Sequence, residues 1–334
     1  MNRQHSWVAS ALTALAVACG SPNTPTPLPD PPAIACPADV TVNGVLGGAQ
    51  PVDFAAPATT AGAPPVTVTC APASGSVFGI GTTPVACTAM DARGRQSQCS
   101  FTVTLMAGAS SVTKFLAFGD SVTAGENGRR AFTGFINPAD TYPARLQLLL
   151  DAAYPGQSIA VVNRGRSGEF AEEGADRLAD ELRKDRPGAL LLLHGYNDLL
   201  KGCPERNPSV AACAEAVTEV MEKVREMIRT ARKPEFGVRY IFVSTLTPPG
   251  PYVPPGDNKR VAPDAIVQTN NRLSALVRSE GVVLVDSYPL FVGHEAEYVD
   301  RDGLHLRPAG YQVLAESFFA AITTAVASTG GFRQ

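Results

Sequence analysis

The chain has 334 residues, of which 45% are hydrophobic, so it can bury more than one core and two domains are the natural expectation. Its formal net charge of −3 argues against nucleic acid as a main partner. It contains four histidines but no C-x-x-C or H-E-x-x-H spacing, so we expect neither a metal ion nor a cofactor.

The first 18 residues have the features of an export signal. Arg3 precedes an apolar run from Trp7 to Ala18, which is far shorter than the roughly 20 residues that span a bilayer. The run ends in Leu15-Ala16-Val17-Ala18-Cys19, which resembles the cleavage box of bacterial lipoproteins, although the usual leucine position holds Ala16. The resemblance implies lipidation of Cys19; the alternative is an ordinary secretory signal. We expect a protein outside the cytoplasm, anchored to a bacterial membrane or secreted.

The cysteines support export. Of the seven, removing Cys19 leaves an even set that can form three disulfides in an oxidising compartment. Cys203 and Cys213 flank a short loop, so a disulfide between them would close it. The pairing of the other four is left open; they are Cys36, Cys70, Cys87 and Cys99.

Residues 19–35 are rich in proline and are expected to form a semi-rigid tether. From 36 to 106 the pattern changes to short alternating strands separated by turn signals, which predicts a small β-sandwich. This segment resembles the hyalin repeat (HYR) domain, which implies an immunoglobulin-like fold. Its role would be spacing, or contact with a glycan or surface partner. The matching residues are Cys36-Pro37, Cys70, Pro72 to Phe78, Gly81, Val85 to Ala89, Asp91, Gly94, Cys99 and Phe101.

After a short linker at 107–113, strands and helices alternate as far as residue 326, and 327–334 form a tail. Continuous apolar runs are typical of strands buried on both faces of a parallel sheet. We therefore predict a three-layer, flavodoxin-like α/β domain over 114–326. Ligands of such sheets bind beyond the carboxyl ends of the strands. The predicted strands are 115–118, 159–162, 189–193, 240–243 and 282–285.

Four short motifs lie at these strand ends or before the last helix. They are Gly119-Asp120-Ser121-Val122, Asn163 to Gly168, Gly195-x-Asn197-Asp198 and Asp302-x-x-His305. A serine, a base, an acid and amide donors are the parts that ester hydrolysis requires. The order of the motifs and the residues in them resemble those of the SGNH (GDSL-type) hydrolase superfamily, with Val122 in place of the usual leucine.

The resemblance implies a role for each residue of the proposed triad. Ser121 would be the nucleophile, His305 the base, and Asp302 the acid that orients His305. Asp300 is the alternative acid. Of the other histidines, His194 is expected to support the site or sit in the core.

The resemblance also implies the donors of an oxyanion hole. These are the backbone amides of Ser121 and Gly168 and the side-chain amide of Asn197. Gly165 is the alternative to Gly168.

The sequence therefore predicts an exported serine esterase acting on carboxylic esters with short or medium acyl groups. One alternative is a carbohydrate acetyl esterase acting on polysaccharide. Removal of Trp7 with the signal would leave no tryptophan for sugar stacking, which weakens that version. An alternative from another class is a non-catalytic surface adhesin, but a complete set of nucleophile, base and acid argues against it.

Overall fold

The computed structural model describes residues 30–45, 49–108, 110–128, 136–206, 209–251 and 260–328. The expected signal peptide, Cys19 and most of the proline-rich tether lie outside these residues. Over the described ranges, no helix is both long enough and apolar enough to cross a membrane.

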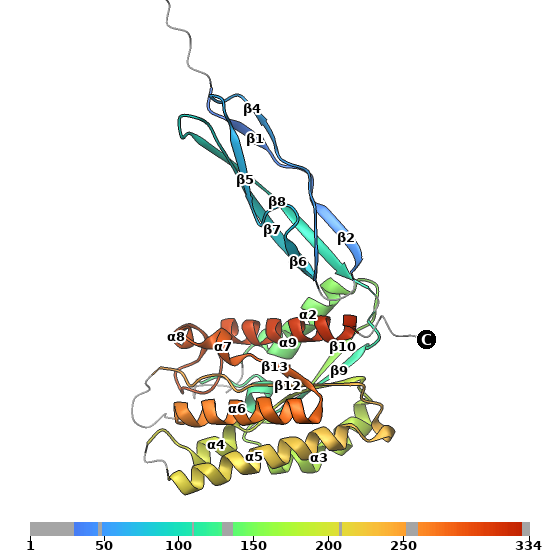
Figure 1. Ribbon diagram of the computed structural model, residues 1–334. Helices are drawn as coiled ribbons and strands as arrows, with labels where there is room; N and C mark the ends of the chain where they lie inside the picture. The colour runs from blue at the N-terminus through green and yellow to red at the C-terminus, as the bar shows by residue number, and fades with distance from the viewer. Residues whose placement is uncertain are drawn as a thin grey trace, which may run out of the picture.

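The N-terminal part of the chain consists of strands. A four-stranded sheet has the order β2-β8-β7-β5, and two smaller sheets pair β1 with β4 and β3 with β6 (Figure 1). The expected alternating strands lie within β5, β7 and β8, and the inward-facing residues, such as Phe78, Val85 and Val103, form a small core. The strands are β1 (Ala33–Ala35), β2 (Val40–Val45), β3 (Ala49–Pro51), β4 (Ala58–Thr60), β5 (Thr67–Ala71), β6 (Val77–Gly79), β7 (Gly81–Met90) and β8 (Gln96–Ala107).

Two disulfides join these strands, and their pairing answers the question that the sequence left open. Cys70 pairs with Cys87, its register partner on the neighbouring strand. Cys36, directly after β1, pairs with Cys99 on β8. The first disulfide therefore lies within the large sheet, and the second links that sheet to the small β1-β4 sheet.

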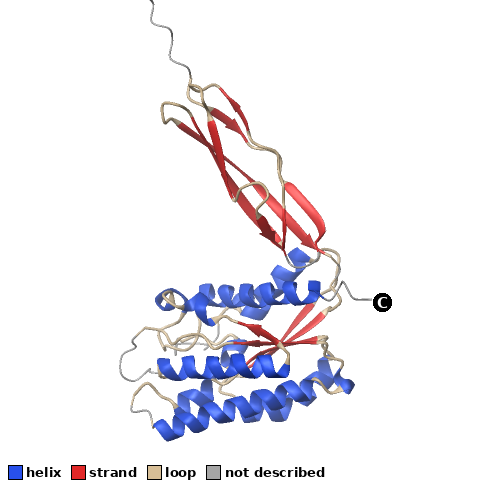
Figure 2. Ribbon diagram, viewed as in Figure 1, coloured by secondary structure: helices blue, strands red, loops and turns tan. Residues whose placement is uncertain are grey.

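The rest of the chain forms a five-stranded parallel sheet in the order β10-β9-β11-β12-β13, which is the flavodoxin-like order. Figure 2 shows the sheet lying between two layers of helices. The strands are β9 (Lys114–Gly119), β10 (Ala160–Gly165), β11 (Ala189–Leu193), β12 (Tyr240–Ser244) and β13 (Val283–Val285).

The two helical layers bury separate cores on the two faces of the sheet. Helices α2 and α9 cover one face, and α3, α5 and much of α6 cover the other. The helices are α1 (Ser121–Ala124), α2 (Tyr142–Ala153), α3 (Ala171–Asp185), α4 (Tyr196–Gly202), α5 (Val210–Ala231), α6 (Pro263–Glu280), α7 (Tyr288–Phe291), α8 (Glu295–Tyr298) and α9 (Pro308–Ser328). Short 3₁₀ turns lie at Pro138–Asp140 and Pro234–Phe236.

The central strand β11 shows why the strands of this sheet are continuous apolar runs in the sequence. All of its residues are buried; Leu191 and Leu193 belong to the α2/α9 core, whereas Leu190 and Leu192 belong to the α3/α5 core. Because successive side chains point to opposite faces, a strand covered on both sides must be apolar throughout.

The β-rich region joins the α/β domain at the amino-terminal edge of the sheet. The Ser110 amide donates to Gln157, which lies in the loop before β10, at 3.1 Å. Val112 is fully buried in the α2/α9 core, so the second half of the segment expected to be a linker packs against the α/β domain. Since β9 runs away from this junction, its carboxyl end lies at the opposite edge.

Candidate active site

Ser121 is the first residue of α1, directly after strand β9. The preceding Asp120 caps this short helix, because its side chain accepts a hydrogen bond from the Val122 amide at 3.0 Å. Gly119 has no room for a side chain, since a Cβ there would lie 2.0 Å from the Leu193 carbonyl oxygen. The strand end and the cap together hold Ser121 at the carboxyl edge of the sheet.

His305 contacts both other members of the expected triad, although it lies 184 residues from Ser121. Its Nε2 is 2.8 Å from Ser121 Oγ, and its Nδ1 is 2.5 Å from Asp302 Oδ2. The other Asp302 oxygen accepts from the backbone amides of Leu304 and His305. Burial by itself would raise the pKa of Asp302, but the hydrogen bond and charge of His305 and these amides outweigh it, and the pKa lies below its ordinary value. Asp302 is therefore an anion that can orient the imidazole.

The alternative acid, Asp300, has different partners. Its carboxylate accepts from the backbone amides of Gly128, at 3.2 Å, and Arg301, at 2.8 Å. The geometry favours Asp302, because its carboxylate is the one within hydrogen-bond distance of Nδ1.

The two candidate glycines for the oxyanion hole differ in whether their amide is free. Gly165 ends β10 opposite Gly119, and its amide donates to Asn163 Oδ1 at 2.9 Å. Gly168 follows in an exposed turn with a φ of +78°, and its amide has no acceptor among the described residues. This favours Gly168.

Asn197, on the first turn of α4, is half-buried. Its Nδ2 donates one hydrogen to the Glu169 carbonyl at 2.9 Å. An amide NH₂ carries two hydrogens, so one remains for a substrate oxygen.

The structure also brings in residues that the motifs did not point to. Glu126, five residues after the serine, has Oε2 3.6 Å from His305 Nε2. The buried carboxylate of Glu169 contacts both Arg177 and His194. No sequence periodicity singled these out, although Glu169 directly follows the candidate Gly168. His294, by contrast, stacks on Tyr298 and is exposed.

Burial acts on two further carboxyl groups beside the site. It raises the pKa of Asp120, with His194 and the Val122 amide opposing the shift. It also raises the pKa of Asp198, although both oxygens accept from the Ala171 amide at the start of α3. Both residues brace loops. Over the described residues, no cluster of three or more His, Cys, Asp or Glu side chains is arranged to hold a metal ion.

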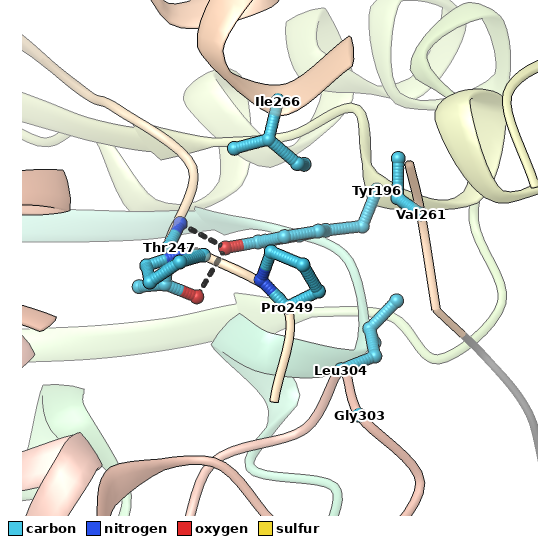
Figure 3. A pocket seen from close by; sticks show the side chains of 8 residues that line it. Tyr196, Thr247, Pro249, Val261, Ile266, Gly303 and Leu304 are labelled. Atoms are coloured by element: carbon cyan, nitrogen blue, oxygen red, sulfur yellow. Dashed lines mark hydrogen bonds between the residues drawn. The ribbon is translucent and has the colours of Figure 1, made fainter. Parts of the chain in front are cut away.

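A small apolar cavity adjoins the motifs (Figure 3). Its volume is about 10 Å³, which is room for about one water molecule. Leu304 and Tyr196, which line it, directly precede His305 and Asn197. Tyr196 is held there by Thr247, whose Oγ1 lies 2.7 Å from the phenol oxygen. The remaining lining residues are Pro248, Pro249, Val261, Ile266 and Gly303.

Comparison with known families finds two matches along the chain. Residues 117–313 match the family model described as the GDSL-like lipase/acylhydrolase family. Residues 29–105 match the HYR domain. A comparison with curated protein sequences finds no match.

Solved structures with a similar fold include a lipase/acylhydrolase from Enterococcus faecalis, with 22% identity, a TM-score of 0.48, and coverage of 64% of this chain and 96% of that chain. Axe2, an acetylxylan esterase from Geobacillus stearothermophilus, has 21% identity, a TM-score of 0.49, and coverage of 67% and 96%. A G-D-S-L family lipolytic protein from Veillonella parvula has 17% identity, a TM-score of 0.45, and coverage of 61% and 94%.

Proposed function

The chain belongs to the GDSL-like lipase/acylhydrolase family and is a carboxylic ester hydrolase, and on that premise we propose that it is an exported serine esterase that removes short acyl groups through Ser121, His305 and Asp302. The observation that carries the proposal is the pair of contacts from the His305 imidazole, 2.8 Å to Ser121 Oγ and 2.5 Å to Asp302.

In the proposed mechanism, His305 Nε2 takes the hydroxyl proton as Ser121 Oγ attacks the ester carbonyl carbon. Asp302 stabilises the imidazolium that forms. The imidazolium then protonates the leaving alcohol, and an acyl-enzyme remains. Water, activated by the same imidazole, hydrolyses that intermediate and restores the serine.

The negative charge that develops on the carbonyl oxygen requires donors. The amides of Ser121 and Gly168 and the free hydrogen of Asn197 Nδ2 are proposed for this role. Loss of one such donor costs on the order of 10²–10³ in rate. The unused Gly168 amide and the second Asn197 hydrogen support the assignment.

The size of the apolar cavity supports the short-acyl version of the function. We assign the acyl group of the substrate to this cavity, whose volume is about 10 Å³ and whose lining includes the neighbours of His305 and Asn197. On this assignment, acetyl esters are expected to be better substrates than butyryl esters. The same expectation suits the alternative of a carbohydrate acetyl esterase, which differs from a simple esterase only in its leaving group.

Three measurements test this proposal. A series of nitrophenyl esters should show the highest kcat/KM with acetate, and Ser121→Ala should reduce it to background while the variant melts normally. Val261→Ala enlarges the cavity and should raise the ratio of butyrate to acetate hydrolysis by about tenfold, or about 1.4 kcal/mol. Acetylated xylan and other acetylated sugars, assayed in parallel, separate the two leaving-group classes. Turnover by Ser121→Ala would remove the mechanism.

We further propose that the HYR region and its disulfides act outside the cytoplasm, and that Cys19 carries a lipid anchor. The HYR region would then hold the hydrolase away from the membrane, or contact a glycan or other surface partner. Fractionation of cells that express the wild type and Cys19→Ser tests the anchor. Release of the Cys19→Ser protein from the membrane fraction is expected, and equal retention of both would contradict it.

A further inference from the structure

The carboxylate of Glu169 is fully buried between the guanidinium of Arg177 and the imidazole of His194. Arg177 Nη2 donates to Oε2 at 2.6 Å, and Arg177 Nε donates to the other oxygen. His194 Nε2 lies 3.2 Å from Oε2. Burial would raise the pKa of Glu169, but the hydrogen bonds from His194 and Arg177 outweigh it and keep the pKa below its ordinary value. A paired anion therefore lies directly beneath the turn that contains Gly168.

Arg177, on α3, also binds the ends of two strands. Its Nη2 donates to the Arg164 carbonyl at 2.8 Å and to the Gly119 carbonyl at 3.4 Å. Its guanidinium lies 4.0 Å from the centre of the Phe118 ring, a cation–π contact. One guanidinium thus joins the strand before Ser121, the strand before the Gly168 turn, and Glu169 itself.

The backbone of Glu169 contacts the other proposed oxyanion donor. Its carbonyl accepts from Asn197 Nδ2 at 2.9 Å, and its amide nitrogen is bonded to the carbonyl carbon of Gly168. A shift of Glu169 would therefore move both donors at once. Donors must lie about 2.7–3.1 Å from the developing oxyanion.

We propose that Glu169, held by Arg177 and His194, is a positioning residue that fixes the distance between the Gly168 amide and the Asn197 side-chain amide. This inference rests on the proposed function of those two donors. A buried ion pair adds little stability relative to apolar side chains of the same size. The cluster therefore contributes by fixing the geometry of the Gly168 turn. It should change the stabilisation of the transition state, and so kcat, more than it changes substrate binding.

The first test is a double-mutant cycle between Glu169→Gln and Asn197→Ala, assayed on nitrophenyl acetate. Glutamine keeps the size of Glu169 but removes the negative charge that pairs with Arg177 and contacts His194. We expect kcat to fall by about 10- to 100-fold, since displacement of a donor by about 1 Å costs rate on that scale, while KM changes less than about threefold. In the Asn197→Ala background, Glu169→Gln should cost less than about fivefold. If Glu169→Gln lowers kcat by the same factor in the wild type and in Asn197→Ala, the proposal is overturned. An equal fall would mean that the substitution acts without Asn197, for example by reducing the amount of folded protein.

The matched control is Glu172→Gln, which removes an exposed carboxylate from the first turn of α3, three residues after Glu169. It should leave kcat within about twofold. A larger loss would mean that any charge change near the start of α3 slows the enzyme, and it would count against a specific role for Glu169.

Gly174→Ala perturbs the cluster without changing its charge. It therefore tests the positioning role of Glu169 even if Glu169→Gln does not fold. A Cβ at Gly174 would lie 2.6 Å from His194 Nε2, so the imidazole must move off Glu169. Alanine also favours the helix by about 1 kcal/mol. We expect a melting temperature near that of the wild type and a fall in kcat of about 3- to 10-fold.

An unchanged kcat in Gly174→Ala would contradict the inference. Ser121→Ala separates the two proposals: an inactive Ser121→Ala beside fully active Glu169→Gln and Gly174→Ala removes only the positioning role. Activity in Ser121→Ala removes the proposed function.

Discussion

Replacement of Asp302 by asparagine tests the proposed triad with the least change in shape. Asparagine keeps an oxygen for the amides of Leu304 and His305, so the loop should fold as before. Its NH₂ group would face His305 Nδ1 in place of the carboxylate oxygen that lies 2.5 Å away. Two donors cannot share that contact, so the imidazole must carry its proton on Nε2 and can no longer accept one from Ser121.

The expected loss in kcat is about 10³- to 10⁴-fold, the scale seen when the orienting acid of a serine triad is changed in this way. It corresponds to about 4–5.5 kcal/mol of transition-state stabilisation. The assay is steady-state hydrolysis of nitrophenyl acetate at pH 7, with a thermal melt to verify folding.

Asp300→Asn is the matched control for this change. Its carboxylate accepts from the Gly128 and Arg301 amides, so kcat should stay within about threefold. The reasoning is refuted if Asp302→Asn keeps more than a tenth of the activity, or if Asp300→Asn is the slower variant. In the second case Asp300 would be the orienting acid.

Three further predictions concern stability and domain structure. The pKa of Asp91 is about 2, below its ordinary 3.8, because hydrogen bonds from Arg95 and nearby amides outweigh its burial. Calorimetry should therefore show that the stability of the β-rich region is constant above about pH 4 and falls towards pH 2. Asp91→Asn should make that stability less dependent on pH. Replacing Cys203 and Cys213 by alanine should lower the free energy of unfolding by up to about 3 kcal/mol in denaturant titrations, because the loop they close is short; no change would mean that the reduced loop is already ordered. A fragment of residues 110–334 should hydrolyse nitrophenyl acetate within a few-fold of the full chain, and a cooperative melt without activity would show that the β-rich region supports the site.

Much of the fold could be predicted from local pattern. The apolar run at Ala189–Leu193 fits a strand covered on both faces, and the structure has it as β11 at the centre of the sheet. Apolar residues recur at helical spacing between Val217 and Ile228, and the structure buries them on one face of α5. These features depend on side-chain periodicity over neighbouring residues, and such periodicity is fully contained in the sequence.

The sequence also predicted which motifs would meet. Ser121 and Asn197 each follow a strand of one parallel sheet, and parallel strands end at the same edge. Because both residues directly follow strands of the same sheet, the sequence implied that they lie close together in space. The choice between Gly165 and Gly168 could not be made in this way, because it depends on whether each amide already has an acceptor.

Pattern and composition thus determined the parallel sheet and the β-rich region before it, and the resemblance of the motifs to a known superfamily indicated the candidate nucleophile and base. Only the tertiary structure decided the pairing of Cys36 with Cys99, the approach of Glu126 to His305, and the burial of Glu169 between Arg177 and His194. Each of these depends on the direction of side chains that loops and packed helices bring together from separate parts of the chain. No local periodicity encodes those directions, since they are fixed only when segments far apart in the sequence pack against one another.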